Sequence, residues 1–82
     1  MAPIGSWSLP TETTLDARGQ NCPLPVLRME KRLEAMRPGE RLIVLATDPM
    51  AKFDIPLYCR RHGHACTISS DADGLRFDIV RA

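Results

Sequence analysis

The stretch TTLDARGQNCPLPVLRMEKRLEAMRPGERLIVLAT, residues 13–47, decides the fold because it contains a complete strand–helix–strand pattern. A short, partly β-branched segment at 13–17 predicts the first strand, and turn-forming residues follow at 18–21. A near-continuous apolar run at 41–47 predicts a buried central strand. Since a helix connects these two strands, we expect them to be parallel with a right-handed crossover.

The connecting helix is predicted from apolar residues at steps of three and four, which are Val26, Met29, Leu33 and Met36. This helix should begin at about Cys22 or Pro23. It should end at Pro38 and Gly39, which cannot comfortably continue a helix. One apolar face of the helix is therefore available to pack on the sheet.

Two further helical segments are predicted in the second half of the chain. Asp48 is a candidate cap for a short helical turn at 48–53. Asp54 is a candidate cap for a second helix, in which Pro56 is tolerated in the first turn and Gly63 is the stop.

Strands are predicted at 64–69 and 75–80, joined by an Asp-Gly turn at 71–74. The element order is therefore β-α-β-α-β-β. It predicts an α/β (α+β) fold, a two-layer sandwich in which two helices cover one face of a four-stranded mixed sheet. The 82 residues are enough for one domain, expected at 13–82 and preceded by a flexible arm at 1–12.

The composition excludes several classes of function. A net charge of +1 argues against a general nucleic-acid binder, and no apolar run approaches the ~20 residues of a membrane helix. The three cysteines are an odd number without a C-x-x-C pair, which argues against a disulfide scaffold and a thioredoxin-type dithiol. The first residues do not have the pattern of a secretory signal. We therefore expect a cytoplasmic protein with free thiols and without direct nucleic-acid or membrane contacts.

Cys22 lies between the first predicted strand and the first predicted helix, where a nucleophile could work. A helix N-terminus favours a thiolate, so the pKa of Cys22 is expected to fall below the free value of ~8.5. Pro23 and Pro25 should stiffen the turn that holds the sulfur, and Arg18 should add positive potential. The alternative is that Cys22 is a small buried residue that packs the helix start. Asp16 is a weaker candidate for a general base and is expected to bond turn N–H groups.

A docking surface is predicted on the helix face roughly opposite the apolar stripe, where four residues fall together: Leu24, Leu27, Arg28 and Lys31. Two exposed leucines beside the thiol, with two cations, suit a partner with an acidic rim. The alternative is that these are scattered surface leucines among solvated charges.

A second cluster of reactive side chains, Cys59, His62, His64 and Cys66, has residue types that bind zinc. Its C-x2-H-x-H-x-C spacing matches no standard zinc finger, and Cys59 shares a helix face with Ile55, which indicates core. We therefore expect no metal site, and for Cys59 a packing role or at most that of an auxiliary thiol.

Taken together, these segments resemble the TusA/SirA-like sulfur-carrier proteins over roughly residues 14–80. An L-D-x-x-G element ends at Gly19, and a C-P-x-P element begins at Cys22. Asp48-Pro49 followed by Asp54-Ile55-Pro56 is similar to the second conserved segment of that family. Three features depart from the pattern, namely Gln20, where Leu or Met is usual, Cys66 and the N-terminal arm.

The resemblance implies the two-layer sandwich and a sulfurtransferase chemistry in which Cys22 carries sulfur as a persulfide. The supporting residues of the motif are Asp16, Arg18, Gly19, Pro23 and Pro25. Sulfur would come from a cysteine desulfurase or a rhodanese and pass to an acceptor protein of the Tus or DsrE type. The family serves tRNA thiolation, molybdoenzyme maturation or sulfur oxidation. We expect a monomer that needs no cofactor beyond the transient persulfide.

Two other functions are compatible with the residues. Cys22 could pack a helix start in a non-catalytic interaction or regulatory module. It could instead act as a redox sensor that forms a disulfide with a partner or with Cys59. Rapid alkylation of Cys22 in the folded protein would favour the carrier over the interaction module.

Overall fold

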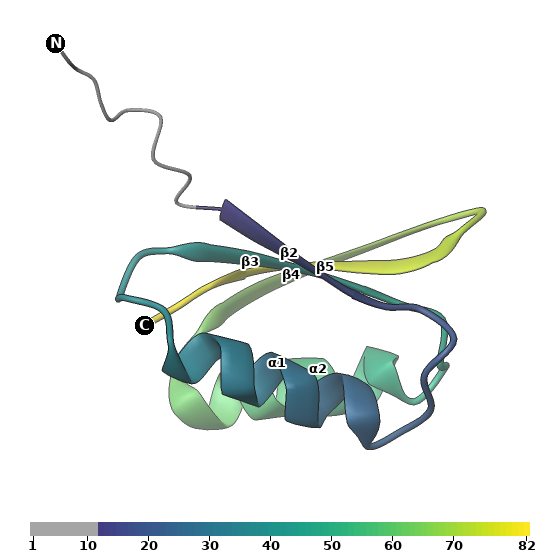
Figure 1. The fold of residues 1–82 in the computed structure, drawn as a ribbon, viewed down its shortest axis with the longest axis horizontal. Coiled ribbons are helices and arrows are strands. Elements are labelled where there is room, and N and C mark those ends of the chain that lie inside the picture. Colours follow the sequence, from purple (N-terminus) through teal and green to yellow (C-terminus); the bar gives the residue numbers. More distant parts are fainter. Residues whose placement is uncertain (1–11) are drawn as a thin grey trace, which may run out of the picture.

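The computed structural model describes residues 12–82, so the arm predicted at 1–12 lies outside the described residues except for Glu12. The elements follow the predicted order: β2 (Glu12–Ala17), α1 (Leu24–Glu34), β3 (Arg41–Ala46), α2 (Ala51–His62), β4 (Ala65–Asp71) and β5 (Gly74–Val80). Figure 1 shows both helices on one face of the sheet. The predicted two-layer sandwich of two helices and a four-stranded mixed sheet is confirmed.

The strands lie in the order β2-β3-β5-β4. The pair β2 and β3 is parallel, and β5 is antiparallel to both of its neighbours, β3 and β4. Ala17 at the end of β2 is paired with Ala46 at the end of β3, so the loops that follow these strands leave the sheet at the same edge. This edge is where α1 and α2 both begin, and it is where reactive groups gather in open α/β sheets.

The core lies between the helices and the sheet. Met29 and Leu33 of α1, Ile55 of α2 and Phe77 of β5 are almost completely buried. Burial of a side chain of this size contributes ~1.5–3 kcal/mol relative to exposure. The apolar stripe predicted for α1 therefore does pack on the sheet, with Val26 only partly buried at its edge. The helix ends at Glu34, before the predicted stop at Pro38, so Met36 is buried just beyond it.

α2 differs from the prediction, because the helical turn expected at 48–53 and the helix expected from Asp54 form one continuous helix. It begins at Ala51, so Asp54 lies in the first turn instead of at the cap. Pro56 lies inside the helix, where it removes one backbone hydrogen bond. Gly63 ends the helix as predicted, with φ 77° in the left-handed region that glycine adopts readily.

Packing explains why α2 does not break. Its buried residues follow one another at steps of four and form a single stripe across both predicted segments: Ala51, Ile55 and Cys59. Burial of this stripe stabilises a helix that local capping signals alone divide in two.

Neither α1 nor α2, the helices formed by residues 12–82, is long and apolar enough to cross a lipid bilayer.

Candidate functional site

Cys22 lies on the turn between β2 and α1, and its side chain is exposed. The helix was expected to begin at Cys22 or Pro23, but α1 begins at Leu24, and Pro23 is the residue that precedes its first turn. Pro25 is buried at the start of the helix. The interpretation of Cys22 as a buried packing residue is wrong, because the thiol faces solvent beside the N-terminus of α1.

Two carboxylates hold Cys22, namely Asp48 from the loop after β3 and Asp54 from the first turn of α2. The backbone N–H of Cys22 donates a hydrogen bond to Asp48 Oδ2, and the Cys22 thiol donates one to Asp54 Oδ2 at 2.9 Å. Asp48 also accepts the N–H of Met50 at 3.0 Å, which links the Cys22 turn to the start of α2. These contacts exist because the parallel strands β2 and β3 bring both loops to the same edge of the sheet.

The expected fall in the pKa of Cys22 is wrong in direction. The pKa of the Cys22 thiol is raised, first by its hydrogen bond to Asp54, then by desolvation and by the negative charges of Asp54 and Asp48. A lower pKa was expected from the partial positive charge of the helix N-terminus alone. Full negative charges in closer contact favour the neutral thiol.

Hydrogen bonds and an ion pair hold the supporting residues of the turn between β2 and α1. Arg18 pairs with Asp16 at 2.9 Å, and its backbone N–H also donates to Asp16 Oδ1 at 3.1 Å. These bonds lower the pKa of Asp16 to about 2. Gly19 has φ 82°, and its N–H donates to Thr47 Oγ1 at 2.8 Å. Thr47 is a turn contact that the sequence pattern did not identify.

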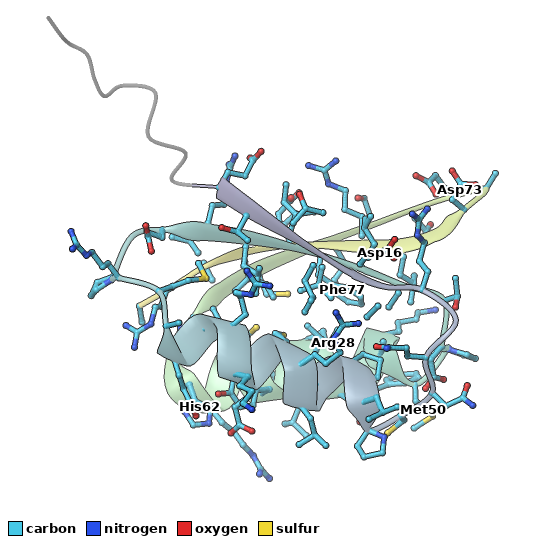
Figure 2. The ribbon with its side chains drawn as sticks, in the orientation of Figure 1. Asp16, Arg28, Met50, His62, Asp73 and Phe77 are labelled. Carbon is cyan, nitrogen blue, oxygen red and sulfur yellow. The ribbon has the colours of Figure 1, made fainter. Side chains whose placement is uncertain are left out.

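Arg28 connects α1 to the same turn. Its Nη1 atom donates to the carbonyl of Asp16 at 3.1 Å and to Gln20 Oε1 at 2.9 Å. In Figure 2, Arg28 reaches from α1 toward the sheet. Gln20, which departs from the family pattern, therefore has a structural partner in this chain.

The remaining residues of the predicted docking surface are solvent-exposed. Leu24 is 49% exposed and Leu27 is 51% exposed, and Lys31 is also on the surface. Leu24 and Leu27 lie in the first turn of α1, next to Cys22, whereas Lys31 lies in the last turn of the helix. The face of α1 that was predicted to point outward is therefore exposed to solvent.

A second exposed apolar group lies at the start of α2 and was not predicted from the sequence. It consists of Met50, Phe53 and Leu57, and Phe53 is 63% exposed. Figure 2 shows Met50 at the end of the molecule where α1 begins. The spacing of three and four residues was a signal that could have revealed this group.

Cys59 belongs to the core and not to the site. It is 1% exposed, and its interaction with the Cys66 thiol, followed by burial, raises its pKa. The rings of His62 and His64 stack near Tyr58. Within residues 12–82, no group of three or more His, Cys, Asp or Glu side chains is arranged to hold a metal ion.

Comparisons with known proteins agree on one family. The family model described as sulfurtransferase TusA matches residues 13–80. Two proteins of Neisseria meningitidis, from serogroups A and B and both named "Putative sulfur carrier protein", are 47% identical over 67 residues, which cover 82% of this chain and 89% of theirs. The crystal structure of a SirA-like protein from Desulfitobacterium hafniense is similar with a TM-score of 0.75 at 25% identity, covering 85% of this chain and 96% of that one.

Proposed function

The chain belongs to the sulfurtransferase TusA family, and on that premise we propose that Cys22 accepts sulfur as a persulfide and passes it to an acceptor protein. The main support for this proposal is that the Cys22 thiol is exposed on a turn that Asp48 and Asp54 hold by hydrogen bonds. A carrier must present the same sulfur to a donor and then to an acceptor. An exposed thiol on a well-held turn meets this need without an enclosed pocket.

The proposed transfer is a thiol–persulfide exchange in which atoms and electrons balance. The Cys22 thiolate attacks the outer sulfur of a donor persulfide, so that a new S–S bond forms and the donor S–S bond breaks. The electron pair of the broken bond leaves on the inner sulfur of the donor, and the proton lost by Cys22 ends there. Delivery repeats these steps with the acceptor as the nucleophile, and no external oxidant or reductant is needed.

The docking surface of Leu24, Leu27, Arg28 and Lys31 supports the partner part of the proposal. The exposed leucines next to Lys31 form an apolar centre with a basic edge, which suits partners with an acidic rim, while the Arg28 guanidinium is turned toward the Cys22 turn. We propose a cysteine desulfurase or a rhodanese as donor and a Tus- or DsrE-type protein as acceptor. The carrier is proposed to act as a cytoplasmic monomer, in a transfer step common to tRNA thiolation, molybdoenzyme maturation and sulfur oxidation.

Intact-protein mass spectrometry after incubation with a cysteine desulfurase and cysteine tests this function. Wild-type protein should gain one sulfur atom that a reductant removes, and Cys22→Ser should gain none. Cys66→Ser is the matched control, because it removes a thiol away from the Cys22 turn and should still gain sulfur. If wild-type protein gains no sulfur from the desulfurase or from a rhodanese with thiosulfate, Cys22 is not a carrier and the interaction module or redox sensor takes its place.

A further inference from the structure

Asp54 contacts the Cys22 sulfur directly, although the sequence pattern indicated only a helix cap at this position. Its Oδ2 atom accepts the thiol hydrogen bond at 2.9 Å across 32 residues of sequence. Asp54 is fixed in the first turn of α2, and its neighbour Ile55 is completely buried in the core. The carboxylate is therefore held against the sulfur by the fold, not by a loop contact.

A carboxylate in this position favours one protonation state of the thiol. The hydrogen bond requires the S–H proton, and a thiolate would instead face the negative charges of Asp54 and Asp48. The raised pKa of Cys22 has these same causes. The resting sulfur is consequently a poorer nucleophile than the position beside a helix N-terminus suggests.

Among residues 12–82, no Lys, Arg or His side chain forms an ion pair with Asp48 or Asp54. The ion pairs among residues 12–82 are Arg18–Asp16, Arg41–Glu12 and Arg76–Asp78. The guanidinium of Arg28 donates to Gln20 and to a backbone carbonyl instead. The charge of Asp54 is therefore available to a cation from another molecule.

Such a cation has access, because Asp54 lines an open groove between the two helices. The other residues of the groove are Pro23, Val26, Leu57, Tyr58, Arg61 and His62. The charged or titratable groups on this side of Cys22 are thus Asp54, Arg61, His62 and Tyr58 from α2, with Asp48 from the preceding loop. A partner docked over Cys22 would cover the mouth of this groove.

We propose that Asp54 keeps Cys22 as a protonated thiol in the free protein, and that a partner which presents a cationic side chain to Asp54 releases the thiolate for transfer. The partner step rests on the carrier function proposed above. An ion pair with the partner draws the Asp54 carboxylate away from the S–H proton and offsets its charge, so that of the two carboxylates only Asp48 still opposes the field of the α1 N-terminus at the sulfur. Docking and activation become a single event. Until then the thiol is protected from other electrophiles, so slow alkylation of the free protein does not favour the interaction module over the carrier.

Two rates measured on the same variants test the proposal. The first is the alkylation of Cys22 by iodoacetamide as a function of pH, followed by peptide mass spectrometry. Asp54→Asn keeps the size of the side chain and removes its charge, so the alkylation midpoint should move to lower pH and the rate at pH 7 should rise several-fold. Glu34→Gln removes the same charge at the opposite end of α1 and should leave the midpoint unchanged. The neutral reagent keeps the charge of the electrophile out of the comparison.

The second rate is sulfur uptake from a cysteine desulfurase. Asp54→Asn should load no faster than wild-type protein, because the cation of the donor has lost its partner. Unchanged alkylation in Asp54→Asn would overturn the protective role, and a several-fold faster uptake would overturn the role of a partner cation. If the desulfurase loads no wild-type protein, the carrier function fails together with the partner step, and the alkylation profile still decides the protective role.

Discussion

The Cys22 sulfur lies between two opposing electrostatic influences. The N-terminus of α1 carries about half of an elementary positive charge, spread over the N–H groups of its first turn. Asp54 places a full negative charge in hydrogen-bond contact at 2.9 Å, and Asp48 adds a second. The nearer and larger charges determine the protonation state of the thiol, which is why its pKa rises.

Asp16 allows a pH prediction at the same scale. Its pKa is about 2 because the Arg18 guanidinium and backbone N–H both donate to it. The interaction is fully present above the ordinary carboxyl pKa of 3.8 and is lost as the pH falls through about 2. In an NMR titration the Asp16 carboxyl signal should have its midpoint at about 2, and Arg18→Ala should move the midpoint up toward 3.8.

The outcome that contradicts this assignment is a midpoint near 3.8 in the wild-type protein. The accompanying change in the free energy of unfolding should be small, because both side chains are exposed and solvent screens the pair.

At the scale of elements, the start of β5 depends on a close backbone approach. Gly74 has φ 128°, and a Cβ atom at this position would lie 2.7 Å from the carbonyl oxygen of Ala46. Gly39 also has a positive φ, 89°, but an added Cβ would meet nothing within 4 Å. Gly74→Ala should therefore lower the free energy of unfolding by ~1–3 kcal/mol more than Gly39→Ala does.

Urea denaturation of the two variants measures this difference. Equal losses of stability would show that only the backbone conformation matters at Gly74, and that the contact with the end of β3 costs nothing.

Elements with strong periodicity could be predicted from sequence. The alternation in 75–80 and the helical stripe through Met29 and Leu33 each correspond to an observed element, because burial on the sheet sets those periods. Residues 48–62 were predicted as two helical segments, because Asp48 and Asp54 are both local capping signals. They contain one helix, α2, because its buried stripe packs on the sheet, and this tertiary packing is not a local signal.

The contact between Cys22 and Asp54 was the part of the site that local pattern did not reveal. The two residues are 32 positions apart, and their proximity follows from the parallel pairing of β2 and β3. The topology itself was predicted, so the adjacency of the two loops was within reach. The direction in which Asp54 points depends on where α2 begins, and that boundary was predicted incorrectly.

At the scale of the whole molecule, the end that carries Cys22 also carries exposed apolar side chains from both helices. Leu27 of α1, in the docking surface, is 51% exposed. Leu27→Glu should weaken sulfur uptake from the protein donor by roughly tenfold, because loss of one apolar contact and charge repulsion by an acidic rim together cost about 1.4 kcal/mol or more.

Thermal unfolding and persulfide formation measured on the same sample check this prediction. Val80→Glu is the matched control, since Val80 is 36% exposed on β5 and alternates with the buried residue Ile79, so that it faces away from the helices. Unchanged sulfur uptake in Leu27→Glu, or an equal loss of uptake in both variants, would show that this face of α1 does not bind the donor.

The location of the sulfur in the loaded protein shows most directly whether Cys22 is the carrier. Protein loaded by a cysteine desulfurase and separated from it would be digested without reductant, and its peptides analysed by mass spectrometry. Carrier function at Cys22 predicts one additional sulfur atom on the peptide that contains Cys22, with Cys59 and Cys66 unmodified. An additional sulfur on Cys59 or Cys66, with Cys22 as a plain thiol, would contradict it.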